Sequence, residues 1–241
     1  MDYFNNIPDI SYRFGNETTF NSFVDLTAYV SIVDEIKDNV SFYNPYYIRE
    51  AMRPDQVSIE LYGTPIYHWT FFFMNEKLKE FGWPIDSQRL LEKAQHTYFK
   101  IAMQTTSDLT NIMKVGQNIQ GVSSGATGIV DSRNLDFGII YVDKTSVTDF
   151  RSSENIFSVV GDVTTEIGVT TSEQYNSPAY YKDANGDRAD FDPLVGPGAL
   201  LTEVTRLEQL TEENEDLRSI KVIKPNLISQ VVSSFKQALS T

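Results

Sequence analysis

Hydrophobic and polar positions divide the chain into three stretches with different patterns. The first, residues 1–104, holds both tryptophans and the strongest helix start and stop signals. The second, 105–172, is rich in Gly, Ser, Thr and Val and has no helical periodicity. The third, 173–241, is turn-rich and ends in an amphipathic segment. The pattern predicts an α+β protein with an N-terminal region, a small β-rich insert and a C-terminal strand–helix region.

The first region predicts a short strand followed by two short helices. Tyr46–Arg49 is aromatic and β-branched, which is typical of a strand. Pro54 is placed to open a helix that Gly63 can cap. Thr64–Pro65 repeats the start signal, so a second helix is expected through to about Asn75.

The second of these helices has no polar face in its second half, because residues 71–74 are all apolar. Such a helix is either sandwiched inside its domain or covered by another chain. A further helix is expected from Ser87 to about Thr106. Upstream, Val24–Val33 is a strand or a buried helix, and periodicity does not decide between them.

The middle region predicts short strands bounded by turn residues, at Val115–Val122, Gly128–Val130, Phe137–Val142 and Ile156–Val160. Several short strands in fewer than about seventy residues favour a small β-barrel or a curled sheet over strand–helix–strand units.

The last region begins with a predicted hairpin at Tyr180–Asp187, where Asn-Gly suits a type I′ turn. A short acidic helix opening at Thr211 and a strand at Ile220–Ile223 follow. Pro225 then starts a final helix with one apolar face, made of Ile228, Val231, Val232, Phe235 and Leu239. This stripe must be buried inside the fold or against a neighbour.

Charge and composition exclude several classes of function. The 241 residues carry 20 Lys and Arg against 33 Asp and Glu, a net charge of −13, which argues against coating DNA or binding anionic membranes. There is no cysteine for disulfides or thiolate metal sites. No secretory signal and no membrane-spanning run is found, so the protein is expected to stay, or be assembled, where it is made.

Candidate chemistry is sparse. His68 is interpreted as a packed, hydrogen-bonded aromatic and His96 as a solvated position, and no nucleophile motif is found. Gly116–Gly121 lacks the spacing and lysine of a nucleotide loop. Asp183–Asp192 lacks the glycine and the final glutamate of a calcium loop, which favours a polar hairpin tip. No enzyme activity, metal, cofactor or small-molecule substrate is predicted.

Aromatic residues crowd into about forty positions between Tyr43 and Trp83. A dense core and a protein interface explain this equally well, and both can hold, because a two-helix unit is too small to bury them all. The expected interface residues on this segment and on the last helix are Tyr62, Trp69, Phe72, Phe73, Trp83, Ile228, Val232 and Phe235.

Two stretches resemble a known family. The strand followed by Asp55-x-x-x-Ile59-x-x-Tyr62-Gly63 and a second helix ending in Asn75 resembles a LysM module over about 43–95. Arg-Pro-Asp before the first helix and Tyr-Gly-Thr-Pro between the helices resemble baseplate wedge protein 53 of contractile-tailed phages. The run from Glu213 to Pro225, within about 203–240, resembles the ending of that family, where an Asn-Glu-x-x-Arg-x-Ile-Lys pattern leads into the last helix.

The resemblance implies a structural virion protein. Such a protein would join a baseplate wedge and clamp neighbouring wedge proteins in a sixfold tail assembly, built in the host cytoplasm, without nucleic acid, membrane or cofactor. The short strands of 105–172 resemble small β-barrel inserts of phage structural proteins, which implies a second contact surface. The alternative is a peptidoglycan-binding LysM protein of the cell wall. The missing secretory signal, the single copy and the bulky second helix count against that alternative.

Overall fold

The computed structural model describes residues 9–15, 18–24 and 39–239. The chain forms two compact units, one from residues 1–86 together with 214–241 and the other from residues 87–213. The second unit is therefore inserted into the sequence of the first. Beyond Val24, the segment predicted as a strand or buried helix lies outside the described residues.

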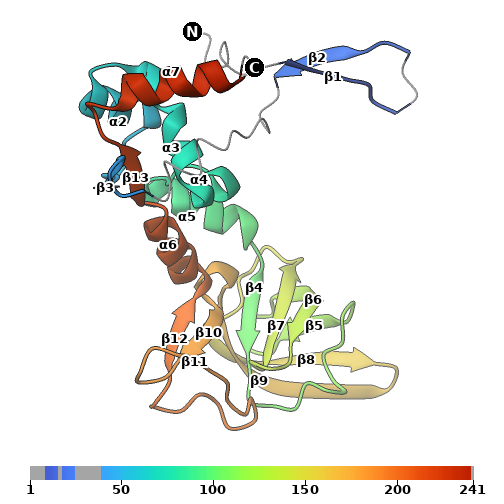
Figure 1. Cartoon of the computed structure of the whole chain (residues 1–241). Coiled ribbons are helices and arrows are strands. Elements are labelled where there is room, and N and C mark those ends of the chain that lie inside the picture. Colours follow the sequence, from blue (N-terminus) through green and yellow to red (C-terminus); the bar gives the residue numbers. More distant parts are fainter. Residues whose placement is uncertain (1–8, 16–17, 25–38, 240–241) are drawn as a thin grey trace. The chain divides into compact units, whose positions relative to one another are not determined.

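The first unit is built from both ends of the chain (Figure 1). Its elements in chain order are β1 (Asp9–Tyr12), β2 (Asn21–Val24), β3 (Tyr43–Tyr47), α2 (Pro54–Tyr62), the 3₁₀ turn η1 (Pro65–Tyr67), α3 (Trp69–Met74), α4 (Glu76–Phe81), β13 (Ser219–Ile223) and α7 (Ile228–Leu239). β1 and β2 form an antiparallel hairpin. β3 pairs antiparallel with β13, and Tyr46 lies opposite Ile220.

The predicted boundaries of the first helix are confirmed, whereas the predicted second helix is divided into the 3₁₀ turn η1 and the helix α3. Pro54 stands in the first turn of α2, and Gly63 ends the helix in the left-handed conformation with φ 72°. Its N–H donates to the carbonyl of Ile59 at 2.9 Å. Thr64 caps the following turn, as expected. Helix α4 was not predicted, and the last helix starts at Ile228 rather than at Pro225.

Helix α3 is sandwiched within the first unit, which decides between the two alternatives left open by its pattern. Phe71 packs into a cluster with Ile48, Val57, Leu78, Ile220 and Val222. Met74, in the same helix, packs into a second cluster with Ile223 and with Ile228 and Val232 of α7. Ile228, Val232 and Phe235 of the last helix are thus buried inside their own unit.

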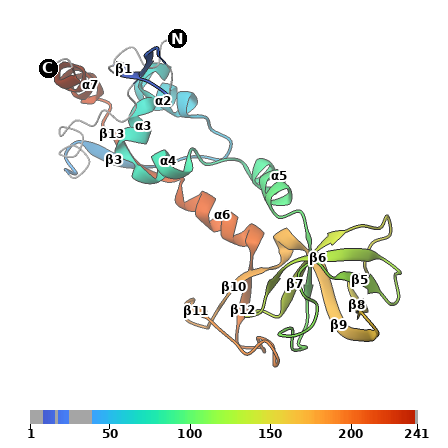
Figure 2. The same ribbon diagram turned by 90° about the vertical axis from the view of Figure 1, so that its right-hand side faces the viewer.

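The second unit holds a closed six-stranded barrel (Figure 2). Its elements are α5 (Ser87–Thr97), β4 (Ile101–Gln104), β5 (Asn118–Gly121), β6 (Thr127–Asn134), β7 (Ile139–Lys144), β8 (Ser153–Val160), β9 (Val163–Glu173), η2 (Gln174–Asn176), β10 (Pro178–Lys182), β11 (Arg188–Ala189), β12 (Thr202–Thr205) and α6 (Arg206–Asp216), whose last residues belong to the first unit. The barrel order is β4-β7-β6-β5-β8-β9.

Alternating side chains fill the barrel. Ile119, Val130, Ile140 and Ile156 point inward from four different strands and are at most 2% exposed. Gly128 permits close packing of β6 on β7, because a Cβ there would lie 2.4 Å from Cγ1 of Val142. The predicted small barrel is present, although its longest strand, β9, was not predicted.

Two predicted elements of this unit are wrong at their ends. The helix from Ser87 stops at Thr97, and Ile101–Gln104 is the strand β4, because its backbone pairs with β7 on one side and β9 on the other. The acidic helix α6 begins at Arg206 rather than Thr211. Thr205 and Glu208 form a capping box, in which the Glu208 N–H donates to the Thr205 hydroxyl at 3.1 Å and the Thr205 N–H donates to the Glu208 carboxylate at 2.8 Å.

The predicted hairpin near residue 180 is confirmed, but its turn type is wrong. Lys182 pairs with Arg188, so five residues connect β10 to β11. A type I′ turn requires a positive φ at both of its central residues. Gly186 has φ 89°, but Asn185 does not have a positive φ. The Asp183 carboxylate shapes the loop by accepting the N–H groups of Asn185 and Asp187 at 2.8 and 3.0 Å.

Candidate protein interface

The two-stranded sheet of the first unit joins segments that are far apart in sequence. The Asn75 side chain, at the end of α3, lies beside β13. Its Nδ2 donates to the carbonyls of Phe71 and Lys221 at 2.8 and 2.9 Å, and its Oδ1 accepts the Lys221 N–H at 2.8 Å. Asn75 therefore fixes the end of α3 to the edge of β13 and occupies the backbone groups that another strand could use.

A second amide holds the segment that precedes β13. Asn214 is 8% exposed, and its side chain accepts the Ile85 N–H at 2.9 Å and donates to the Ile85 carbonyl at 3.0 Å. Arg218, which is 5% exposed, donates to the carbonyls of Ile48 and Ile85 at 3.4 and 3.3 Å. Its guanidinium also forms an ion pair with Glu215. These contacts satisfy a buried charge and tie residues 214–218 to the N-terminal half of the unit.

The polar ends of two large aromatic residues also find backbone partners. The Tyr62 hydroxyl donates to the Ile223 carbonyl at 2.9 Å, and Trp83 Nε1 donates to the Met52 carbonyl at 2.7 Å. Burial raises the pKa of Tyr62 well above its usual value, so the hydroxyl stays protonated and acts as a donor. Both residues are thus fixed in orientation by the unit itself.

Three rings connect α3 to α7. Phe235 is 3% exposed, and its ring centroid lies 5.3 Å from that of Trp69 and 5.2 Å from that of Phe73. Trp69 and Phe73 meet edge to face at 5.2 Å. The outer side of this cluster is covered in part by Lys79, whose ammonium lies 5.5 Å from the Phe73 ring centre.

All eight interface residues expected from the sequence contribute to packing within the first unit. Ile228, Val232 and Phe235 are buried, and Tyr62, Trp69, Phe72, Phe73 and Trp83 are partly buried. Between Tyr43 and Trp83 the large apolar residues that are exposed are instead Tyr47, Ile59, Ile66 and Phe81, with exposed fractions of 58, 50, 55 and 66%. Ile59 lies off the buried face of α2, which is formed by Val57 and Ser58. Phe81 ends α4, a helix that was not predicted, so its exposure could not be inferred from a helical pattern.

Catalytic chemistry finds little support in the described part of the chain. His68 Nδ1 lies 2.9 Å from the Pro65 carbonyl, which confirms the packed interpretation, and His96 is exposed as expected. Gly116–Gly121 runs into strand β5 rather than into a helix. Within the described residues, no group of three His, Asp or Glu side chains is placed to hold a metal ion. No helix among them is long and apolar enough to cross a membrane.

Comparison with known families gives one match. A family model described as base plate wedge protein 53 matches residues 21–108, which confirms the resemblance over that part of the chain. The match supports a structural role in a phage baseplate, and hence a place in the virion tail and association with other baseplate proteins. No curated protein matches the chain.

Proposed function

We propose that this protein is a wedge component of a phage baseplate that clamps neighbouring wedge proteins together during tail assembly, with its first unit as the main contact surface. The observation that carries the proposal is the convergence of two stretches with the family's pattern. Residues 47–75 lie inside the matched segment and residues 214–221 lie outside it, yet both belong to one unit. Asn75 and Arg218 hold them together.

The same contacts support a LysM-like unit as the core of this surface. β3, α2 and α3 follow one another in sequence, and the strand that pairs with β3 is β13, not a segment within 43–95. A strand–helix–helix–strand order is therefore completed across the inserted second unit. This arrangement is the proposed fold of the contact module.

Exposed apolar side chains on the first unit suit a contact with other proteins. Tyr47 and Phe81 are more than half exposed, which is costly for large aromatic residues unless another surface covers them in the assembly. The Tyr47 hydroxyl donates to the Glu215 carboxylate at 2.6 Å, so the ring is held in a fixed position before a partner arrives. The net charge of −13 keeps the free subunit soluble and favours encounter with basic partner surfaces.

The proposal is tested by assembly in a phage that lacks the corresponding wedge protein. Supplied in trans, the full chain is expected to restore sixfold baseplates and to co-elute with wedge proteins on size-exclusion chromatography. A parallel pull-down on purified cell wall separates the alternative, a peptidoglycan-binding protein. Wall binding without co-elution would reject the wedge assignment.

A further inference from the structure

The hairpin of β8 and β9 extends beyond the barrel strands on either side of it (Figure 1). Its two strands pair from Ser153 opposite Thr170 to Val160 opposite Val163. On one side β5 pairs with β8 only at residues 156–157, and on the other side β4 pairs with β9 only from Thr170 onward. Among the described residues, the part of β9 before Thr170 therefore has a neighbouring strand on its β8 side only.

Backbone groups of Thr164 and Glu166 point to this open edge of β9. Thr105, which directly follows β4, donates its hydroxyl to the Gly168 carbonyl at 2.8 Å, so the backbone groups of Gly168 face the β4 side. Successive residues of a strand turn their N–H and C=O groups to opposite sides. Counting back from Gly168 in steps of two, Glu166 and Thr164 also face away from β8, and both residues are exposed.

The sequence of β9 contains none of the features that usually protect such an edge. The strand has 11 residues, is rich in Val and Thr, and contains no Pro, Lys or Arg. By contrast, Asn75 bonds the outer edge of β13, β3 carries Pro45 at its centre, and β11 has only two residues. An exposed, unprotected edge of β-branched residues is the feature by which a sheet accepts an added strand.

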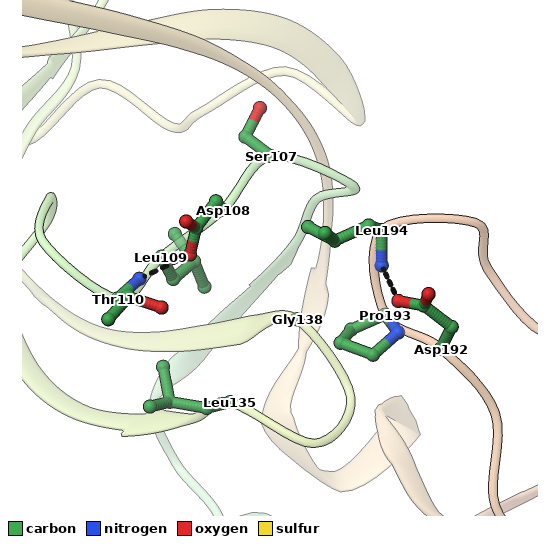
Figure 3. Close-up of a pocket in the computed structure, with 9 residues that line it drawn as sticks. All are labelled: Ser107, Asp108, Leu109, Thr110, Leu135, Gly138, Asp192, Pro193 and Leu194. Carbon is green, nitrogen blue, oxygen red and sulfur yellow. Dashed lines mark hydrogen bonds between the residues drawn. The ribbon is translucent and has the colours of Figure 1, made fainter.

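A cavity in the same unit offers no comparable set of groups (Figure 3). It has a volume of about 260 Å³ and lies between three loops. Two carboxylates, those of Asp108 and Asp192, line it, and each accepts an N–H of its own loop, at 2.8 and 2.9 Å. These carboxylates hold their loops in shape, whereas the edge-facing groups of β9 have no neighbouring strand to bond.

From the open edge we infer that β9 binds an extended segment of a partner protein, which pairs with residues 164–168 as an additional strand. The outward N–H and C=O groups of Thr164 and Glu166 would then each gain a backbone partner. On one face of the added strand, β-branched side chains would pack beside Thr165 and Val163, which is 64% exposed. On the other face, a basic side chain would lie opposite Glu166.

The partner is a different protein rather than a second copy of this chain. In the antiparallel register that pairs Thr164 with Gly168 of another copy, the two Glu166 side chains lie opposite each other, and like charges at such positions are destabilising. Each copy also carries a net charge of −13, which opposes close approach. The inference places a contact on the second unit, and it rests on the proposed function only for the identity of the partner.

A peptide tests the pairing without any baseplate component. The probe is acetyl-Lys-Val-Thr-Val-Lys-Val-Thr-Val-Lys-amide, which sets its central lysine opposite Glu166 in either strand direction. It is titrated into the full chain, and hydrogen exchange of single backbone amides is followed by NMR. The amides of Thr164 and Glu166 should exchange at least about tenfold more slowly with saturating peptide, while those of Thr165 and Ile167, which face β8, change little.

Two methylated peptides provide a matched control. Methyl groups on the backbone nitrogens of the central lysine and both threonines remove the N–H donors that would face β9, and at least about a tenfold loss of affinity is expected. Methyl groups on the valine nitrogens lie on the other edge of the added strand and should leave binding as it is. Both peptides keep every side chain, so the comparison isolates the backbone pairing, and it uses the wild-type chain.

A substitution tests the edge itself. Thr164→Pro removes one outward N–H, as Pro45 does in β3, and should weaken binding of the unmodified peptide at least about tenfold. Thr164→Val changes the side chain but keeps the N–H, so it should bind as the wild type does.

The inference is overturned if the two methylated peptides bind equally, if Thr164→Pro binds the probe as tightly as the wild type, or if the probe leaves the exchange of Thr164 and Glu166 unchanged. It is also overturned if light scattering shows the free chain to be a dimer in which these two amides are already protected, because a second copy would then occupy the edge.

Assembly separates this inference from the proposed function. If the wild-type chain enters baseplates but does not bind the probe, the strand-addition site fails and the wedge role stands. If the probe binds as expected but the wild-type chain does not enter baseplates, the wedge role fails and the strand-addition site stands.

Discussion

Asn75 and Lys221 are 146 positions apart and exchange two hydrogen bonds, in which the asparagine amide takes the place of a neighbouring strand. Lys221 lies opposite Pro45 in the sheet. The N–H and carbonyl of Lys221 bond Asn75, so they point away from β3 and toward α3. This direction suits Pro45, which has no N–H to offer the opposite strand. One side chain thus closes a sheet edge and joins the two halves of a discontinuous unit.

Replacing Asn75 with alanine should destabilise the first unit by about 1–3 kcal/mol, because the Lys221 N–H and carbonyl lose their partner in a partly buried position. Both tryptophans, Trp69 and Trp83, lie in this unit. Urea unfolding followed by tryptophan fluorescence therefore reports on the first unit alone. The control Asn118→Ala, exposed on the barrel, should leave the fluorescence midpoint unchanged; an equal loss in both variants would contradict the role of Asn75 as a tether.

Phe235→Ala should cost the first unit about 3–5 kcal/mol, because it leaves a cavity against Trp69 and Phe73. The same fluorescence measurement gives the loss, while far-UV circular dichroism should still report the strands of the barrel. A wild-type midpoint for this variant would mean that α7 is not packed on α3 in solution.

Phe81→Ser should leave the stability of the first unit nearly unchanged but reduce incorporation into baseplates. The side chain is 66% exposed, so we expect a change in unfolding free energy of no more than about 0.5 kcal/mol. Incorporation into baseplates should nevertheless fall, because an exposed aromatic at an interface often carries much of the binding energy. Val147→Ser, at a residue that is 99% exposed on the barrel unit, serves as the matched control. Full incorporation of Phe81→Ser would remove this residue from the proposed contact surface.

Glu154 makes the stability of the barrel sensitive to acid. Burial by itself would raise the pKa of this carboxylate, but N–H donors from Arg151, Ser124 and Ser123 and the Ser124 hydroxyl outweigh burial and leave the pKa below its usual value. A lowered folded-state pKa adds stability above the ordinary glutamate pKa, and this stability is lost as the pH falls through the folded-state value.

The matching experiment compares wild type and Glu154→Gln by thermal unfolding between about pH 3 and pH 7, with circular dichroism at a wavelength dominated by strands. We expect the variant to be less stable at neutral pH and the difference to shrink toward low pH. A difference that is constant across the range would show that the carboxylate charge is not involved.

Local signals in the sequence predicted local structure well. Pro54, Gly63 and Thr64 each act through the backbone of their immediate neighbours, and their helix boundaries are where the pattern places them. The start of α6 was misplaced at Thr211 because a local signal, the Thr205–Glu208 capping box six residues earlier, was overlooked. Ile101–Gln104 failed for a different physical reason. It is a strand because of partners at 139–142 and 170–173, and these cannot be read from the segment itself.

The aromatic surplus was harder to interpret for a related reason. Trp69 and Phe73 look like an uncovered surface when residues 43–83 are considered alone, since the pattern does not reveal which segment will cover them. Phe235, 162 positions further along than Phe73, provides much of that cover.

The pairing of β3 with β13 also sets an order of events during synthesis. Tyr43–Tyr47 leaves the ribosome about 170 residues before the strand that completes its sheet, so the inserted barrel is made while the first unit is still waiting. A polypeptide released early would carry a finished barrel beside an open N-terminal half. The sheet of the first unit is therefore the last to be completed, and a chain that ends before residue 219 lacks the strand that pairs with β3.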